Sequence, residues 1–440
     1  CGPNPTSWRP AASPSAGPLA SATLPATLMP SPAPTATPEP SPTPTPAKRA
    51  PVIVISFDGA SAEQVNRWMA AGQLPTFERL AAQGLRAERV HTVDPPLTAA
   101  AHASMVSGAY PAHTGIVSNQ FHNPADSFYW YRSGFEEPID SVDPIWVSAS
   151  RAGLVTAALF VAGGTPFLPA QTADYTIAYG QQLSYSKLET LNLTKAAAAW
   201  QGAPPISYSP AMAGEWLIPK GASVYLYAID SQDDGQISYD FLLLNHERSF
   251  SQALELQIGV WGALEVDPTT TAGAHFLLRQ MTPQGGGLAV TLYHTGINQN
   301  TAAPRPLLEA LNAEYGFFPA GADSYALEHG WITPEEYLQM LSRSAAWIAD
   351  VTAWVYDQYQ PDLLFTWFDT FDSAGHEFFL PPESVGNDPA LALRRQYFDQ
   401  AAQIADEALA QVLSAISPEE NNVFVVSDHG MAAISQTVNL

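Results

Sequence analysis

From Pro51 onward the chain alternates between continuous apolar runs and segments with a helical pattern of apolar positions. A short run that is apolar throughout predicts a strand buried on both faces. Such runs cover residues 52–57, 154–161, 363–368 and 423–427. Helical patterns cover residues 61–71, 75–83, 98–107, 345–358 and 390–416. Strands and helices that alternate in this way predict an α/β fold with a mostly parallel sheet and helices on both faces.

Smaller features complete this pattern. Residues 85–93 predict one more strand, and Thr98 is the expected N-cap of the helix over residues 98–107, with Gly108 just past its end. Between about residues 205 and 305, short apolar runs lie between Gly and Asp turns, which predicts an antiparallel β insertion. The aromatic run 128–131 predicts packing in the core, with a substrate wall as the alternative.

The first 48 residues differ in composition from the rest. They carry many of the chain's 39 prolines among Ser, Thr and Ala, which predicts an extended or disordered linker without a packed core. The chain begins with Cys1 and Gly2, as bacterial lipoproteins do after their signal peptide is removed; a fragment boundary is the alternative. We expect a lipid on Cys1, a tether over residues 1–48, and a folded domain over residues 49–440 outside the cytoplasm.

Composition narrows the choice of partners. The chain has 440 residues, of which 46% are hydrophobic, with 18 basic and 42 acidic residues and a formal net charge of −24. A nucleic-acid-binding surface needs a basic footprint, so none is expected. Any anionic ligand has to be held locally, by metal ions or by helix N-termini. The one cysteine excludes a disulfide within the chain, and no apolar run reaches the length of a membrane-spanning helix.

Metal-ligand residue types follow three of the apolar runs. They are Asp58 after residues 52–57, Asp372 with His376 after residues 363–368, and Asp428 with His429 after residues 423–427. In open parallel sheets, ligands bind beyond the carboxyl ends of the strands, and Asp and neutral His are suitable zinc ligands. One such Asp is usually a turn residue or a cap, but three together predict a metal site.

Thr98 adds a candidate nucleophile, because it opens a predicted helix whose unpaired amides favour an anion. A threonine hydroxyl needs a base or a metal to activate it. An ordinary N-cap is the alternative for this residue taken alone.

These motifs together resemble the nucleotide pyrophosphatase/phosphodiesterase branch of the alkaline phosphatase superfamily. The matching segments are residues 54–59, 98–116 and 144–146, Asp372-Ser-Ala-Gly-His376, and Ser427-Asp-His-Gly-Met431. The resemblance implies an alkaline-phosphatase-like sheet flanked by helices and a hydrolase of small-molecule phosphodiester or pyrophosphate substrates. It also implies two zinc ions and a phosphothreonine intermediate.

The resemblance assigns roles to individual residues. Asp58, Asp428 and His429 would hold one zinc, with Thr98 as its reactive ligand. Asp372 and His376 would hold the other zinc. Asn119, 21 residues after Thr98, would contact the phosphoryl oxygens, with a turn residue as the alternative.

Two departures from the family pattern matter. His102 follows Ala100-Ala101, where the family has Pro-Asn, so we expect it to be structural. The family's second zinc takes another histidine downstream of Asp-His-Gly, and no histidine follows His429 in this sequence. We therefore expect a chain truncated at its C-terminus or an incomplete second site. The alternatives to a diesterase are a phosphomonoesterase of the same superfamily and a non-catalytic surface lipoprotein. A sulfatase is not expected, because no Cys-x-Pro-x-Arg segment is present.

Overall fold

The computed structural model describes residues 49–433, apart from residue 128 and residues 203–206, 219–222, 268, 382–383 and 385. The expected linker with Cys1 and the last residues, 434–440, lie outside this range. The lipid anchor and the expected truncation therefore stay predictions. Among the described residues, none of the helices combines the length and the apolar character needed to cross a membrane.

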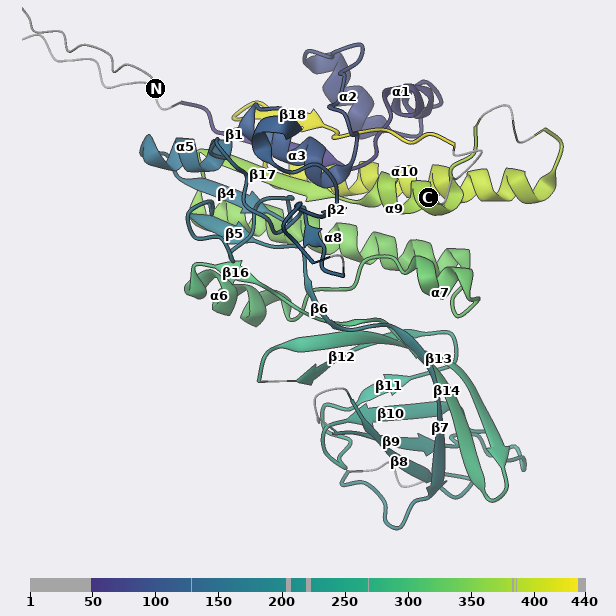
Figure 1. Cartoon of the computed structure of the whole chain (residues 1–440). Coiled ribbons are helices and arrows are strands. Elements are labelled where there is room, and N and C mark those ends of the chain that lie inside the picture. Colours follow the sequence, from purple (N-terminus) through teal and green to yellow (C-terminus); the bar gives the residue numbers. More distant parts are fainter. Residues whose placement is uncertain are drawn as a thin grey trace, which may run out of the picture. The chain divides into compact units, whose positions relative to one another are not determined.

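A six-stranded sheet forms the centre of the α/β part, in the order β16-β5-β4-β17-β1-β18 (Figure 1). All neighbours are parallel except β16 and β5. The strands are β1 (Val52–Phe57), β4 (Thr156–Leu159), β5 (Tyr175–Ile177), β16 (Ala302–Ala303), β17 (Leu363–Phe368) and β18 (Asn422–Val426). Because β17, β1 and β18 are adjacent and parallel, the segments that follow them meet at one end of the sheet.

Helices cover this sheet. They are α1 (Ala62–Ala70), α2 (Pro75–Gln83), α3 (Thr98–Ser107), α4 (Pro111–Thr114), α5 (Ile145–Arg151), α6 (Arg305–Tyr315), α7 (Ser324–Glu328), α8 (Pro334–Tyr359), α9 (Thr370–Phe378) and α10 (Pro389–Ala415). A small hairpin pairs β2 (Gln120–Phe121) with β3 (Arg132–Ser133).

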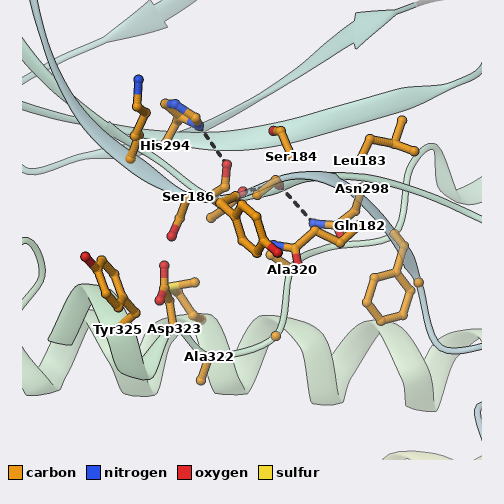
Figure 2. A pocket seen from close by; sticks show the side chains of 18 of the residues that line it. Gln182, Leu183, Ser184, Ser186, His294, Asn298, Ala320, Ala322, Asp323 and Tyr325 are labelled. Carbon is orange, nitrogen blue, oxygen red and sulfur yellow. Dashed lines mark hydrogen bonds between the residues drawn. The ribbon is translucent and has the colours of Figure 1, made fainter. Parts of the chain in front are cut away.

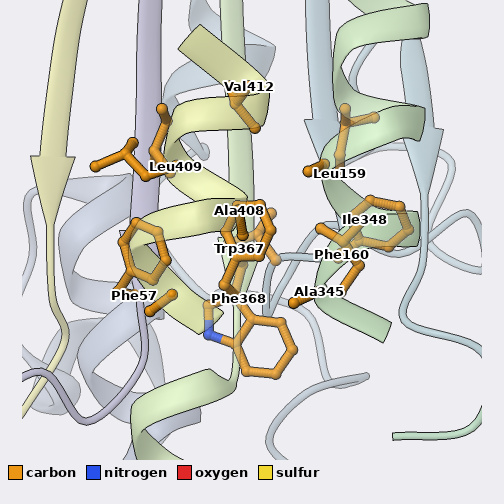
Figure 3. Packing of buried hydrophobic residues seen from close by; sticks show 14 of the residues in the cluster. Phe57, Leu159, Phe160, Ala345, Ile348, Trp367, Phe368, Ala408, Leu409 and Val412 are labelled. Atoms are coloured by element: carbon orange, nitrogen blue, oxygen red, sulfur yellow. The ribbon is translucent and has the colours of Figure 1, made fainter. Parts of the chain in front are cut away.

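Side chains of β17 alternate between two helical layers. Thr366 shares a hydrogen bond with Thr352 of α8, whereas the ring of Phe365 packs against Trp146 of α5. Figure 3 shows α8 and α10 packing on the core, where Ile348 lies near Leu159 and Phe160. Helices on both faces bury every residue of β17, which explains why its sequence is a continuous apolar run.

The segment between β5 and β16 forms a separate ten-stranded antiparallel sheet. Its strands are β6 (Gln181–Ser184), β7 (Lys187–Lys195), β8 (Met212–Leu217), β9 (Ser223–Ile229), β10 (Phe241–Asn245), β11 (Leu254–Leu256), β12 (Trp261–Asp267), β13 (Ala272–Gln284), β14 (Gly287–His294) and β15 (Ile297–Gln299). This β insertion starts near residue 181 rather than 205. It has its own hydrophobic core, centred on residues such as Leu226, Leu242 and Val290.

Four local predictions are wrong. The strand over residues 423–427 is not buried on both faces, because β18 is an edge strand of the sheet and its Phe424 is 53% exposed. Residues 85–93 form no strand, and the side chains of Leu85 and Val90 are exposed instead of packed in the sheet. In the aromatic run, Tyr129, Trp130 and Tyr131 are 92%, 62% and 56% exposed, so they do not pack in the core; residue 128 lies outside the described residues. Helix α3 begins at Thr98 and takes Leu97 as its N-cap, so the Thr98 hydroxyl is not used as a cap.

Candidate metal centre

Two carboxylates and one imidazole converge where β1 and β18 end. Asp58 follows β1 directly, and Asp428 and His429 follow β18 after one further residue. One ligand atom from each of these three residues lies within 4.8 Å of the others. No other cluster of three or more His, Cys, Asp or Glu in the described part of the chain has this spacing. The predicted first ligand set is therefore brought together by the fold.

Each carboxylate in this group has one hydrogen-bonded oxygen and one free oxygen. Asp58 Oδ2 accepts from Trp367 Nε1 at 3.2 Å, and Asp428 Oδ1 accepts from the backbone N–H groups of Gly59 and His429. Asp58 Oδ1 and Asp428 Oδ2 are buried and have no hydrogen-bond donor among the described residues. Buried polar atoms are nearly always paired, and two carboxylate oxygens without a donor, side by side, are suited to binding a cation.

The third donor is His429 Nε2, which lies 3.2 Å from Asp58 Oδ1 and 3.4 Å from Asp428 Oδ2. His429 Nδ1 lies 3.1 Å from the carbonyl oxygen of Gly430. A carbonyl oxygen only accepts, so Nδ1 carries the proton and Nε2 keeps its lone pair for a metal. Ser427 holds this loop, because its hydroxyl donates to the His429 carbonyl and accepts from the Ala60 amide.

The charges around Asp58 also favour a cation. Burial, followed by the nearby carboxylates of Asp428 and Asp372, holds the pKa of Asp58 well above its usual value. Carboxylates that face one another out of water destabilise each other's ionised form, and a bound cation removes this penalty. The donor set of two carboxylates and one imidazole suits zinc.

Thr98 completes this cluster from the other side. Its Oγ1 lies 3.2 Å from His429 Nε2, and the residue is buried at the first position of α3. The backbone amides of the first turn of α3 have no partner within the helix, so they favour an anion here. One of them, the amide of Ala99, donates to Asn119 Oδ1 at 2.9 Å. This bond fixes the Asn119 side chain and leaves its Nδ2 as a donor beside the start of the helix.

His102 supports the centre from within the core. It is fully buried, its Nδ1 donates to the Thr98 carbonyl at 2.9 Å, and its Nε2 accepts from the Ser56 hydroxyl at 3.0 Å. Burial lowers the pKa of His102, so the ring is neutral. Nδ1 also lies 3.3 Å from Asp428 Oδ2. Both ring nitrogens are engaged by protein atoms, which fits the structural role expected for this residue.

Asp372 and His376 form a second, smaller pair on α9. His376 Nε2 lies 3.5 Å from Asp372 Oδ2, and this contact raises the pKa of His376. The loop after β1 approaches this pair closely. Gly59 has a φ of +70°, and a Cβ there would lie 2.9 Å from the Asp372 Cα, so glycine permits the approach. The described residues bring no third ligand into a cluster with this pair, and His91, His113 and His122 do not form one.

Two residues near the centre are missing from the sequence prediction. Trp367 is the donor to Asp58, and its ring packs against Tyr179 at 5.2 Å. Asp369 is buried, and it accepts from the hydroxyls of Tyr179 and Ser373. Burial raises its pKa. Asp369 directly follows an apolar strand, and this position could have indicated a functional residue. Nothing in the sequence distinguishes Trp367 from an ordinary core residue.

The fold and this site define a class: a mixed α/β protein with a parallel sheet, a possible Asp/His metal group at the strand ends, and a buried threonine beside it. The sequence profile of the family described as "Type I phosphodiesterase / nucleotide pyrophosphatase" matches residues 52–440. The chain belongs to this family. The family's description places it among hydrolases of phosphodiester and pyrophosphate bonds.

Similar proteins match over part of the chain. Human ectonucleotide pyrophosphatase/phosphodiesterase family member 1 is 31% identical over 116 residues, which cover 26% of this chain and 12% of the human protein. Mouse family member 7 is 29% identical over 119 residues, which cover 26% of this chain and 26% of that protein. The matched segments thus span about a quarter or less of these relatives.

Among solved structures, an inactive variant of murine ectonucleotide pyrophosphatase/phosphodiesterase 5 in complex with AMP aligns with a TM-score of 0.36 and 13% identity. The alignment covers 87% of this chain and 57% of that one. Phosphonoacetate hydrolase from Sinorhizobium meliloti aligns with a TM-score of 0.36 and 12% identity, over 87% of this chain and 56% of that one. With TM-scores this low, the description of the fold rests on the strand order of the sheet and not on these alignments.

Proposed function

We propose that the protein hydrolyses phosphodiester or pyrophosphate bonds with zinc, through a phosphothreonine intermediate on Thr98. One observation carries this proposal: the Thr98 hydroxyl and the two carboxylate oxygens without a donor, on Asp58 and Asp428, all lie within 3.4 Å of His429 Nε2. An ordinary helix start needs neither the buried carboxylates nor the imidazole. A structural metal site does not need the free hydroxyl of Thr98.

The residues present fit the first metal. Asp58, Asp428 and His429 would hold a zinc ion, with Thr98 as a further ligand. When bound, the ion would lower the pKa of the threonine hydroxyl and offset negative charge on the phosphoryl group.

The side chains around Thr98 favour attack on phosphorus. The Thr98 hydroxyl loses its proton to solvent, Oγ1 bonds to the phosphorus, the bond from phosphorus to the leaving oxygen breaks, and the leaving group departs with its electron pair. The free amides at the start of α3 and Asn119 Nδ2 donate to the phosphoryl oxygens, where negative charge is concentrated. With a diester substrate, the phosphoryl group on Thr98 still carries the second ester, and water then releases it as a phosphomonoester.

Helix α9 offers ligands for a second zinc. We propose Asp372 and His376, which would give two of the three protein ligands that an open zinc site usually has.

Trapping the intermediate tests the proposal. Zinc-loaded protein is mixed with bis(4-nitrophenyl) phosphate, quenched in acid during turnover and analysed by peptide mass spectrometry. We expect the 4-nitrophenyl phosphoryl group on Thr98. Thr98→Ser should keep a measurable rate because it keeps a hydroxyl, and Thr98→Ala should lower kcat by about 10³-fold or more. Undiminished turnover by Thr98→Ala would show that water attacks the substrate directly.

A further inference from the structure

A cavity of about 1410 Å³ lies between the β insertion and the α/β part, outside the candidate metal centre. The insertion contributes residues 182–187, 189, 216–218, 294–296 and 298, and the α/β part contributes residues 318 and 320–325 with Trp331 and Asp369. In Figure 2, Asp323 and Tyr325 lie on the helix side of this space, and Ser184 and Ser186 lie on the insertion side. The volume is sufficient for a ligand larger than the average drug-sized molecule.

Two exposed aromatic rings line this cavity from opposite walls. Tyr185, in the turn between β6 and β7, is 84% exposed, and Tyr325 of α7 is 55% exposed. The Tyr325 ring is held in place: it stacks on His329 with ring centroids 3.9 Å apart and meets Trp331 edge-on. A fixed, exposed aromatic face attracts the partly positive C–H groups of an apolar ligand face, because the face of the ring is electron-rich.

The cavity lining also presents neutral hydrogen-bonding groups. Gln182, Ser184, Ser186 and Asn298 come from the insertion. Across from them, each oxygen of Asp323 already accepts one bond, from the Tyr293 hydroxyl and from the Ala326 amide. A carboxylate oxygen can accept more than one bond, so Asp323 is both fixed in position and able to accept from a ligand hydroxyl.

The charge of the lining does not favour an anion. Among the described residues that line the cavity, Lys187 is the only Lys or Arg, and its Nζ lies 2.7 Å from Glu189 Oε1. Burial lowers the pKa of His294, so this ring supplies no positive charge near neutral pH. Asp323 and Asp369 add negative charge. A phosphate group would meet carboxylates here without an unpaired cation, which costs free energy.

We propose that this cavity binds an uncharged carbohydrate. A sugar ring has C–H faces that suit Tyr185 and Tyr325. Its hydroxyl groups both donate and accept, which suits the amides, hydroxyls and carboxylates of the lining. A large neutral polyol also needs no cation. The carbohydrate comes either from a free glycan or from the sugar portion of a phosphate ester. The site does not depend on the reaction proposed above.

Calorimetric titration of the full chain with cellohexaose, mannohexaose and hexa-N-acetylchitohexaose tests the site. We expect at least one of them to bind with a Kd between about 10 µM and 1 mM. Tyr185→Ala and Tyr325→Ala should each weaken binding about tenfold, since each removes one aromatic face. Tyr208→Ala is the matched control, because Tyr208 is a 48% exposed tyrosine of the insertion that does not line the cavity. It should bind with the affinity of the wild type.

Three results would overturn the proposal. The first is the absence of any heat of binding with the sugars at about 10 mM. The second is unchanged affinity in the Tyr185→Ala/Tyr325→Ala double variant with an unchanged Tm, and the third is tighter binding of glucose 6-phosphate than of glucose.

A second experiment follows hydrolysis of bis(4-nitrophenyl) phosphate as the sugar concentration increases. Inhibition that tracks the binding curve assigns the cavity to the sugar portion of the substrate, and an unchanged rate assigns it to a separate glycan. The calorimetric result stands whether or not the diester is hydrolysed.

Discussion

The hydroxyl oxygen of Thr98 lies 3.2 Å from Nε2 of His429, although 331 positions separate the two residues. The contact joins the start of α3 to the loop after β18. It brings the candidate nucleophile to the one nitrogen of His429 that keeps its lone pair, because Nδ1 is bonded to the Gly430 carbonyl.

Replacing Asp58 should separate the destabilising effect of its buried charge from its contribution to zinc binding. In metal-free protein, Asp58→Asn removes a negative charge that burial, Asp428 and Asp372 all disfavour, so it should raise Tm. The same substitution removes a zinc ligand, so the rise in Tm that zinc produces in the wild type should be lost. Differential scanning calorimetry with EDTA and with zinc measures both effects.

Asp357→Asn is the control for this experiment, since Asp357 is exposed on α8 and is not one of the candidate ligands. It should respond to zinc as the wild type does. A zinc response that survives in Asp58→Asn would remove Asp58 from the ligand set.

Asn119 offers a matched pair of substitutions. Asn119→Asp keeps an oxygen that accepts from the Ala99 amide, but it replaces the Nδ2 donor with a second negatively charged oxygen. We expect kcat/KM for a diester to fall by about 10²-fold, with little change in Tm. Asn119→Ala loses both groups, so it should lower both activity and Tm. If Asn119→Asp retains full activity in steady-state assays, Asn119 is a structural turn residue.

The hydrogen bond between Ser56 and His102 tests whether His102 only positions the centre. Ser56→Ala leaves His102 Nε2 buried without its donor, which should lower the free energy of unfolding by about 1–3 kcal/mol. Because Nδ1 still holds the Thr98 carbonyl, kcat should change by less than about tenfold. Urea unfolding and diester hydrolysis give the two readouts. A loss of kcat as large as that of Thr98→Ala would give His102 a direct part in the reaction.

Protonation of His275 in the β insertion should make the free energy of unfolding depend on pH. It is buried against Phe317, and burial with the nearby Arg343 lowers its pKa to about 3. Between the unfolded pKa of about 6.5 and about 3, the unfolded chain binds a proton that the folded chain does not. Stability from this group is therefore complete above about pH 6.5 and is lost as the pH falls, by at most about 1.4 kcal/mol per pH unit.

The substitution His275→Gln should flatten this dependence. Urea unfolding at pH 7.5 and at pH 5 should show a smaller loss of stability for the variant than for the wild type. An identical loss in both proteins would mean that His275 is hydrated or already protonated in the folded state.

Much of the α/β part could be predicted from local sequence. The run over residues 363–368 predicts a strand with both faces buried, and β17 has this property because α5 and α8 pack on opposite sides of it. The strand-end positions of Asp58 and Asp428 follow from the same rule, since parallel strands place their carboxyl ends together. The prediction of a strand over residues 85–93 was wrong. A segment forms a strand only where a neighbouring strand pairs with its backbone, and a local sequence pattern does not show whether such a neighbour exists.

The sequence by itself determined the strands β1, β4 and β17, the helices α1, α2, α3 and α10 with the second half of α8, and the residue types that gather at the strand ends, because these depend on short-range patterns of polarity. Only the tertiary structure decided which oxygen of each carboxylate is free, that Trp367 occupies the other oxygen of Asp58, and that the Thr98 hydroxyl faces His429 instead of capping its helix. It also placed Tyr185 and Tyr325 on opposite walls of one cavity. These features depend on distances between segments remote in the chain, which packing sets and local pattern does not record.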